Sequence, residues 1–424
     1  MRISHLLLPT LTLCLVWGAA AQAQRPPAGD GALAAKRYRN LFLENGHTQK
    51  EISQKIDAAF QQLFHGDKDT QTVYYEAGKN DNGPLGYVSD INNKDVRSEG
   101  MSYAMMIAVQ MNKKAEFDAL WNWSMTYMYQ SKPTHPSYGY FSWSMKLDGT
   151  PNSESPAPDG EEYWATALYF AGHRWGDGKG IYDYRAQAGR LLDSMKNRAI
   201  IDGPTNRAPE TGGPQFHPEH KMVRFTPNLR RPDHTDPSYH LPAFYELWAL
   251  WGPVKDRPFW KDAAGVSRDY FQKSSHPVTA LTPNYANYDG TPVTTGGGGN
   301  ANFAADAWRT AANWAVDWSW WAADPRERQL SDKIQAFFES KGIDEYVNRY
   351  TLDGTPQGGS HSTALVATNA ITSLAATDQA RAKKFVEALW KAQIPSGQYR
   401  YYDGMWYMMG LLHCAGEFRI WPPK

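Results

Sequence analysis

The sequence has very little cysteine and no excess of charge of either sign. Only Cys14 and Cys414 occur among the 424 residues. Cys14 lies in an N-terminal segment that we expect to be removed, so no internal disulfide is predicted and the fold must depend on its hydrophobic core. Basic and acidic residues number 44 each. Because nucleic-acid-binding proteins normally carry a basic excess, this balance argues against a nucleic-acid partner.

Long apolar runs are absent beyond the N-terminus. Residues 1–23 start with Met1 and Arg2, continue through an apolar stretch and end in Ala-Gln-Ala, which is the pattern of a signal peptide with its cleavage site. The apolar stretch is too short for a transmembrane helix. We therefore expect export to the periplasm or the medium, and no membrane partner after removal of the signal. Residues 24–35, with two adjacent prolines and two glycines, are predicted to be flexible.

Several catalytic and binding signatures are also missing. The sequence contains no Gly-x-Ser-x-Gly motif of serine hydrolases. The four-glycine run at 296–299 has no following Gly-Lys-Ser/Thr, which argues against a phosphate-binding loop. His217 and His220 are separated by a proline and do not share a helical face, so a zinc site is not predicted.

Helical patterns dominate the remaining sequence. A capping box at 48–51 opens an amphipathic segment with Ile52, Ile56, Phe60 and Leu63 on one face. Further helices are predicted near 99–111, 114–130, 161–175, 183–198, 240–251, 258–273, 303–322, 326–340, 361–376, 379–392 and 404–415. Almost wholly apolar helices, such as 99–111, occur together with amphipathic ones, such as 114–130. This mixture favours an all-α barrel of two concentric layers, formed by one domain over residues 36–424.

Large aromatic residues are abundant, with 17 Trp and 24 Tyr. Such side chains combine a flat apolar face with a polar edge, which suits the C–H faces and hydroxyl rims of sugars. They also fill helical cores, so composition alone leaves both interpretations open.

The first carboxyl with possible chemical importance is Glu99. It follows Ser98, a candidate N-cap, at the start of an almost wholly apolar helix. A glutamate in a first helical turn is ordinary, because the helix dipole stabilises it. A carboxyl at the mouth of an apolar helix can instead have its pKa raised, as a general acid requires. The position of Glu99 in the sequence is compatible with both roles.

Two further carboxyls raise the same question. Asp159 follows a Pro-Ala-Pro stretch and is placed to cap the next helix. Asp306 is predicted to lie inside an apolar helix, where a charged side chain is rarely left unpaired, and Arg309 three residues later is a candidate partner. The alternative for Asp306 is a functional carboxylate that faces a cleft.

Together these motifs resemble glycoside hydrolase family 8. Residues 97–103 (RSEGMSY) resemble the family's acid motif, residues 306–309 (DAWR) its base motif, and residues 159–163 (DGEEY) the segment with a sugar-binding carboxylate. Residues 236–242 (DPSYHLP) are similar to the segment whose Tyr contacts the attacking water, and residues 399–404 (YRYYDG) to a sugar-lining C-terminal stretch. The motifs follow in the family's order.

The resemblance implies an (α/α)6 barrel and hydrolysis with inversion of configuration. It makes Glu99 the general acid and Asp306 the general base. The substrate-binding residues that it implies are Asp159, Tyr239, Trp143, Arg309, His361 and Tyr402. Because acid–base hydrolysis needs only two carboxyls and water, no metal and no organic cofactor are expected.

Two loop regions, residues 285–292 (with 176–178) and residues 361–370, resemble the reducing-end xylose-releasing exo-oligoxylanases of that family more than its cellulases. In that subgroup a Leu-His-Pro triplet blocks the groove just past the reducing-end sugar, whereas the matching residues here are Ser360, His361 and Ser362. His361 of the triplet is retained, and the rest of the chain resembles the exo subgroup more closely. We therefore expect release of xylose from the reducing end of xylo-oligosaccharides or xylan. We also expect the protein to be a monomer.

The first alternative is an endo-β-1,4-xylanase of the same family, followed by an endoglucanase or chitosanase. From another class, a non-catalytic carbohydrate-binding protein is a further alternative. The presence of both Glu99 and Asp306 argues against it, because a binding protein needs no acid–base pair.

Overall fold

The computed structural model describes residues 31–295 and 300–424. The predicted signal peptide and the beginning of the predicted flexible segment lie outside the described residues. Residues Ala32–Ala35, at the end of the predicted flexible segment, form the one-turn helix α1, in which Ala32 is buried. The reason is close packing on α10, since a Cβ atom at Gly31 would lie 2.3 Å from the backbone oxygen of Trp320. No helix in the described part of the chain is both long and apolar enough to cross a bilayer.

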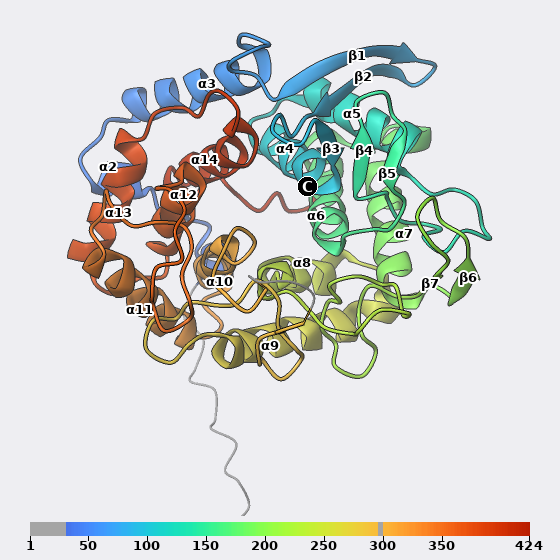
Figure 1. Cartoon of the computed structure of the whole chain (residues 1–424). Coiled ribbons are helices and arrows are strands. Elements are labelled where there is room, and N and C mark those ends of the chain that lie inside the picture. Colours follow the sequence, from blue (N-terminus) through green and yellow to red (C-terminus); the bar gives the residue numbers. More distant parts are fainter. Residues whose placement is uncertain (1–30, 296–299) are drawn as a thin grey trace, which may run out of the picture.

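Helices make up most of the described chain (Figure 1). Besides α1 and the short α2 (Leu41–Glu44), residues 31–295 and 300–424 contain twelve substantial helices. They are α3 (Gln49–His65), α4 (Ser98–Gln110), α5 (Lys114–Trp123), α6 (Pro158–Trp175), α7 (Tyr184–Asn197), α8 (Pro242–Trp251), α9 (Arg257–Ser274), α10 (Trp308–Trp321), α11 (Arg326–Ser340), α12 (Thr363–Thr372), α13 (Gln379–Lys391) and α14 (Arg400–Cys414).

The twelve helices form two concentric rings. Helices α4, α6, α8, α10, α12 and α14 each contact the next, and α14 closes the circle on α4. The outer helices pack against this ring, for example α5 on α4, α7 on α6 and α9 on α8. Figure 1 looks into the ring from one end. The predicted all-α (α/α)6 barrel is therefore confirmed.

Sequence patterning explains which helices lie inside. Every residue of α4 except Glu99 is buried, as expected for a helix that is apolar on all sides. The outer helix α3 instead buries only one face, which includes Ile52, Ile56 and Phe60, and its predicted capping box between Thr48 and Glu51 is present.

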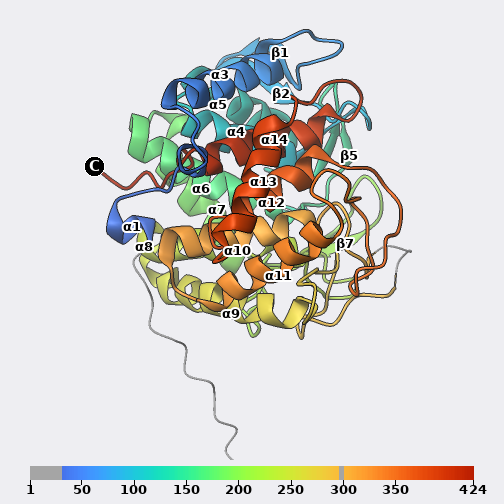
Figure 2. The same ribbon diagram turned by 90° about the vertical axis from the view of Figure 1, so that its left-hand side faces the viewer.

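In the part of the chain that the structure describes, three small antiparallel sheets lie outside the helices. They consist of β1 (Tyr74–Asn80) with β2 (Gly83–Val88), β3 (Asp95–Arg97) with β4 (Ser144–Lys146) and β5 (Pro151–Ser153), and β6 (Ile201–Gly203) with β7 (Glu210–Gly212). The C-terminal tail lies at the opposite end of the barrel from β5 and β7 (Figure 2). There Trp421 contacts Gln110 and His173, at the C-terminal ends of α4 and α6.

Two details of the predicted helix starts are wrong. Helix α10 begins at Trp308, so Asp306 precedes the helix instead of lying inside it. The reason is that Phe303 exchanges backbone hydrogen bonds with Tyr350, which holds this stretch in an extended bridge. Ser98 is the first residue of α4 and makes no capping bond through its side chain. It packs instead against Gly160 of α6, where an added Cβ atom would lie 2.7 Å from the Cβ of Ser98.

Candidate active site

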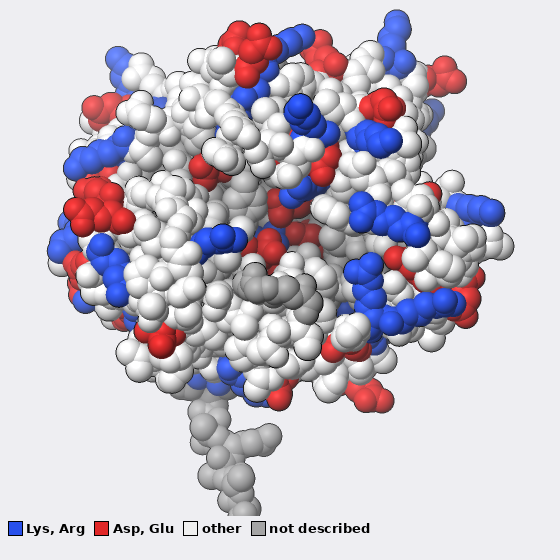
Figure 3. Space-filling model, viewed as in Figure 1, with Lys and Arg blue, Asp and Glu red and all other residues white. Residues whose placement is uncertain are grey.

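The N-terminal ends of the inner helices meet at one groove. Glu99 and Asp159 lie in the first turns of α4 and α6, and Asp306 precedes α10. Tyr239, in a 3-10 turn before α8, lines the groove together with these carboxyls. His361 before α12 and Tyr402 in the first turn of α14 line its continuation. In Figure 3, acidic side chains form the floor of the central hollow.

Arg309 is the centre of this arrangement. Its side chain is only 3% exposed, and its guanidinium contacts Glu99 at 3.3 Å, Asp159 at 2.8 Å and Asp306 at 3.4 Å. Its Nε also donates to the hydroxyl of Ser238 at 3.1 Å. One buried cation therefore fixes three carboxyl groups that come from distant parts of the sequence.

The spacing of Glu99 and Asp306 follows from these contacts. Both carboxyls touch nitrogens of the same guanidinium. Their contacting oxygens are therefore at most about 9 Å apart, within the upper limit of the roughly 6.5–9.5 Å that inverting glycosidases use. The side chains are 18% and 29% exposed, so both carboxyls reach the groove.

The environment of Glu99 favours the protonated acid. Burial raises the pKa of Glu99 to about 7, against the lowering effect of Arg309, and the nearby charges of Asp159 and Asp306 raise it further. The hydroxyl of Tyr401 donates to Oε1 of Glu99 at 3.2 Å. Glu99 can therefore hold a proton near neutral pH while it faces the groove.

Asp159 and Tyr239 lie on the same side of the Glu99–Asp306 pair. Burial raises the pKa of Asp159, and the charge and hydrogen bond of Arg309 oppose that rise. The ring of Tyr239 lies 5.4 Å from the guanidinium of Arg309. Both residues line a cavity of about 410 Å³ that also holds the half-buried Trp143.

The groove continues beyond Glu99 and Asp306 on the other side. A second cavity, of about 400 Å³, is lined by both carboxyls and by Trp308, His361 and Tyr402. The hydroxyl of Tyr402 donates to the carbonyl oxygen of Ala305 at 3.0 Å, next to Asp306. This side therefore places His361 and Tyr402 opposite Trp143, with the two carboxyls between them.

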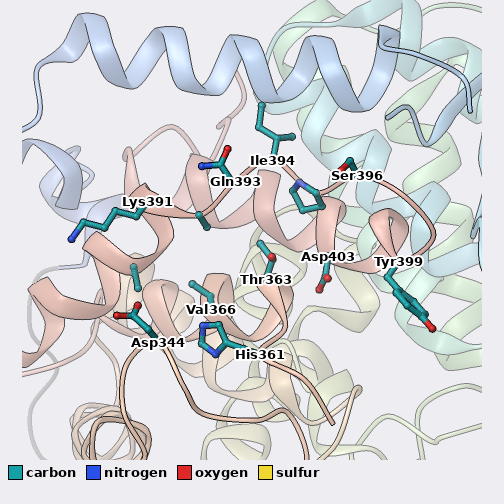
Figure 4. A pocket seen from close by; sticks show the side chains of 13 residues that line it. Asp344, His361, Thr363, Val366, Lys391, Gln393, Ile394, Ser396, Tyr399 and Asp403 are labelled. Carbon is teal, nitrogen blue, oxygen red and sulfur yellow. The ribbon is translucent and has the colours of Figure 1, made fainter. Parts of the chain in front are cut away.

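A third cavity adjoins the second. It has a volume of about 460 Å³ and shares His361, Tyr399 and Asp403 with it. Figure 4 shows His361 at one edge of this cavity and Lys391 and Gln393 farther along it. His361 thus stands at a boundary between two cavities.

All eight site residues expected from the sequence line this groove. Sequence reasoning missed Tyr401, which binds Glu99, and Tyr103, whose hydroxyl contacts Nη1 of Arg309. The i, i+4 spacing of Glu99 and Tyr103 on an apolar helix is a signal that could have identified Tyr103. Tyr401 lies beside Tyr402 in residues 399–404, and no pattern in the sequence distinguishes it as a partner of Glu99.

No group of three or more metal-ligating side chains occurs among residues 31–295 and 300–424. The carboxyls of the groove are held by Arg309, which contacts all three of them.

Comparisons with known proteins agree on one family. The family described as "Glycosyl hydrolases family 8" matches residues 81–416. A reducing end xylose-releasing exo-oligoxylanase from Halalkalibacterium halodurans is 44% identical, over 93% of this chain and 97% of the relative.

Solved structures are similar as well. A GH8 xylanase from Teredinibacter turnerae, solved as a catalytic mutant with xylohexaose, has 56% identity and a TM-score of 0.91, covering 93% of this chain and 100% of its own. Rex8A from Paenibacillus barcinonensis, solved with xylose, has 43% identity and a TM-score of 0.85 at the same coverage.

Proposed function

The chain belongs to glycosyl hydrolases family 8 and is a glycoside hydrolase. We propose that it cleaves β-1,4-xylosidic bonds with inversion and releases xylose from the reducing end of xylo-oligosaccharides. The observation that carries this proposal is the cluster of Glu99, Asp306 and Arg309 at the centre of a groove with cavities on both sides. The names of relatives at 37–44% identity support the xylose-releasing activity.

In the proposed mechanism, Glu99 protonates the leaving oxygen while Asp306 takes a proton from the attacking water. The raised pKa of Glu99 keeps it protonated at the start of the reaction. Asp306 is the more exposed of the two side chains, at 29% against 18%, and it lies 3.4 Å from the guanidinium of Arg309. Tyr239 lines the same cavity as Asp306 and is proposed to hold the water.

Asp159 is proposed to bind the sugar whose bond is cleaved. Its Oδ2 accepts from Arg309 at 2.8 Å, which fixes the carboxylate for a hydroxyl of the distorted ring. An interaction that holds the reacting sugar in place lowers the barrier by orientation.

Asp159→Asn is expected to reduce kcat by about 100-fold, because a small misplacement of a reacting group costs that much. The amide oxygen can still accept from Arg309, so the melting temperature should stay within a few degrees. Steady-state kinetics and thermal melting check this prediction. Full activity with unchanged melting would show that Asp159 only serves the helix start.

Trp143→Ala is expected to raise KM by about fivefold, because aromatic stacking contributes about 1 kcal/mol beyond buried area. The fold should be affected little, since Trp143 is half-buried. The carbonyl oxygen of Trp143 accepts from the N–H of Ser98, and its own N–H donates to the carbonyl oxygen of Ser155. These backbone hydrogen bonds do not depend on the Trp143 side chain.

The matched control is Trp318→Ala, which removes a half-buried ring that packs under Arg328 away from the groove. It should leave KM unchanged. If Trp143→Ala lowered the melting temperature strongly and left KM unchanged, Trp143 would be a core residue.

His361 is proposed to recognise the reducing-end sugar. Its Nδ1 lies 2.8 Å from the carbonyl oxygen of Tyr346. Because a carbonyl only accepts, this nitrogen carries a proton, and in a neutral imidazole Nε2 is then the acceptor. Since His361 lines the cavity beyond the two carboxyls, Nε2 is suited to a hydroxyl of the terminal xylose.

Endo-xylanase action is the second candidate, and specific observations favour it. Ser360 and Ser362 replace larger residues of the blocking triplet, and Gly358 and Gly359 have positive φ angles in the same loop. The cavity past His361 offers room for further sugars. The similar Teredinibacter turnerae structure is named a xylanase and holds xylohexaose.

A time course with reducing-end-labelled xylohexaose separates the two candidates. Exo action predicts labelled xylose as the first labelled product and little loss of viscosity on polymeric xylan. Labelled xylobiose or xylotriose as the first product, with a rapid fall in viscosity, would show that the loop is open and that endo action is correct.

We also propose that the enzyme is exported and acts as a monomer on xylo-oligosaccharides or xylan. The signal-like residues 1–23 support export. N-terminal sequencing of enzyme recovered outside the cytoplasm should begin at Gln24, and an intact Met1 would argue against export.

A further inference from the structure

Two arginines lie at the outer end of the groove, on the side away from His361. Arg207 and Arg231 line the same cavity as Trp143, and both are exposed. Nε of Arg207 donates to the carbonyl oxygen of Asn152 at 2.8 Å. Within residues 31–295 and 300–424, no ion pair is found for either guanidinium.

The acidic residues nearby already have partners. Asp202 pairs with Arg230, Asp233 with Arg224, and Glu154 with His135. Glu210 accepts a hydrogen bond from Ser155. Within the described residues, therefore, no carboxylate forms an ion pair with Arg207 or Arg231, and the carboxyls that line the same cavity are held by Arg309. In Figure 3, basic side chains border the central hollow on the side of β5, β6 and β7.

The fold holds the two arginines at one place. Arg207 lies in the hairpin between β6 and β7, and Arg231 lies in a loop that is bonded to β7. In that loop the backbone N–H of Leu229 donates to the carbonyl oxygen of Thr211 at 2.8 Å, and Asn228 forms a bridge with Gly212. The loop and the hairpin thus form one unit beside the groove.

A neutral xylan chain does not require positive charge in this position. Guanidinium groups bind carboxylates through paired N–H donors, and two of them favour an anionic group strongly over a neutral one. The three carboxyls around Arg309 disfavour an anion at the inner end of the cavity. An acidic substituent is therefore accommodated only at the outer end.

We propose that Arg207 and Arg231 bind the carboxylate of a uronic acid substituent, such as glucuronate, carried by a xylose unit on the side of the cleaved bond opposite His361. This inference rests on the proposed function, because it concerns the substrate class of the same groove. It makes acidic xylo-oligosaccharides better substrates than neutral ones of equal length.

The test compares kcat/KM for xylo-oligosaccharides of one length that carry a glucuronate, an arabinofuranosyl group or no substituent. The wild-type ratio of the glucuronate substrate to the unsubstituted one should exceed 1. In the double variant R207Q/R231Q this ratio should fall about tenfold, as expected for two exposed charge contacts. Added 0.5 M NaCl should lower the wild-type ratio as well.

The matched control is Arg37→Gln, an exposed arginine outside the groove, which should leave the ratio unchanged. A wild-type ratio of 1 or less that neither the double variant nor salt alters would overturn the proposal. If the arabinofuranosyl substrate were preferred equally, the outer end would recognise bulk instead of charge, which also overturns it.

A binding measurement separates this proposal from the proposed function. Calorimetric titration of the Glu99→Gln variant with the glucuronate and unsubstituted oligosaccharides needs no turnover. About tenfold tighter binding of the acidic ligand, lost on R207Q/R231Q, supports the site. Binding of neither oligosaccharide would contradict the proposed function, whereas equal binding of both would contradict only the arginine site.

Discussion

Replacing Glu99 with Gln is expected to lower kcat on xylo-oligosaccharides by about 10²–10⁴-fold, the usual contribution of a general acid. Gln has the same shape, its amide oxygen can accept from Arg309, and its amide N–H can donate to the hydroxyl of Tyr401, but it cannot donate a proton to the leaving oxygen as an acid does. The fold should therefore survive while turnover is lost. Steady-state rates together with the melting temperature measure both effects.

The control is a xyloside whose leaving group is acidic enough to depart without protonation. On such a substrate Glu99→Gln should lose far less activity. For the wild-type enzyme on ordinary substrates, kcat/KM should fall as the pH rises through about 7, because a general acid works only while protonated and burial raises the pKa of Glu99 to about 7. Equal losses on both substrates would assign Glu99 another role.

Replacing Arg309 with Met is expected to destabilise the protein by about 3–5 kcal/mol, the cost of leaving buried charges without a partner. The side chain is 3% exposed and contacts Glu99, Asp159 and Asp306. The melting temperature should fall by several degrees and activity should be lost, because the carboxyls are no longer held together. Thermal unfolding of the variant at several pH values measures this effect.

The pH dependence of that loss has a defined sign. Burial already raises the folded-state pKa values of Glu99 and Asp159, and loss of the opposing charge of Arg309 raises them further, so the folded variant binds more protons and its stability falls as the pH rises. The deficit should be larger at pH 8 than at pH 5. Adding Asp159→Asn to Arg309→Met should restore part of the stability. A variant that melts like the wild type at both pH values would contradict the central role of Arg309.

Most of the barrel was predictable from local patterns. Helical segments that are apolar on nearly all sides identified inner helices such as α4, and spaced apolar residues identified outer ones such as α3. The start of α10 was not predictable, because it depends on a backbone bridge between Phe303 and Tyr350. These two residues are far apart in the sequence, so no local pattern reports their contact.

The candidate site was predictable in its residues but not in its connections. The motifs gave Glu99, Asp159 and Asp306, and sequence spacing suggested only that Arg309 pairs with Asp306. The structure shows that Arg309 contacts all three carboxyls. Asp159 and Glu99 precede Arg309 by 150 and 210 positions in the sequence. Their contacts with Arg309 require the closed ring of helices, which periodicity alone does not determine.

Proton NMR during hydrolysis of xylotriose tests the central claim most directly, namely that Glu99 and Asp306 act on opposite faces of the sugar. Water that attacks from the face opposite the leaving group converts a β-bond into an α-anomer. The account predicts that the reducing end of the xylobiose product, which hydrolysis creates, appears first as the α-anomer and then equilibrates with the β-anomer. A β-anomer as the first product would contradict it.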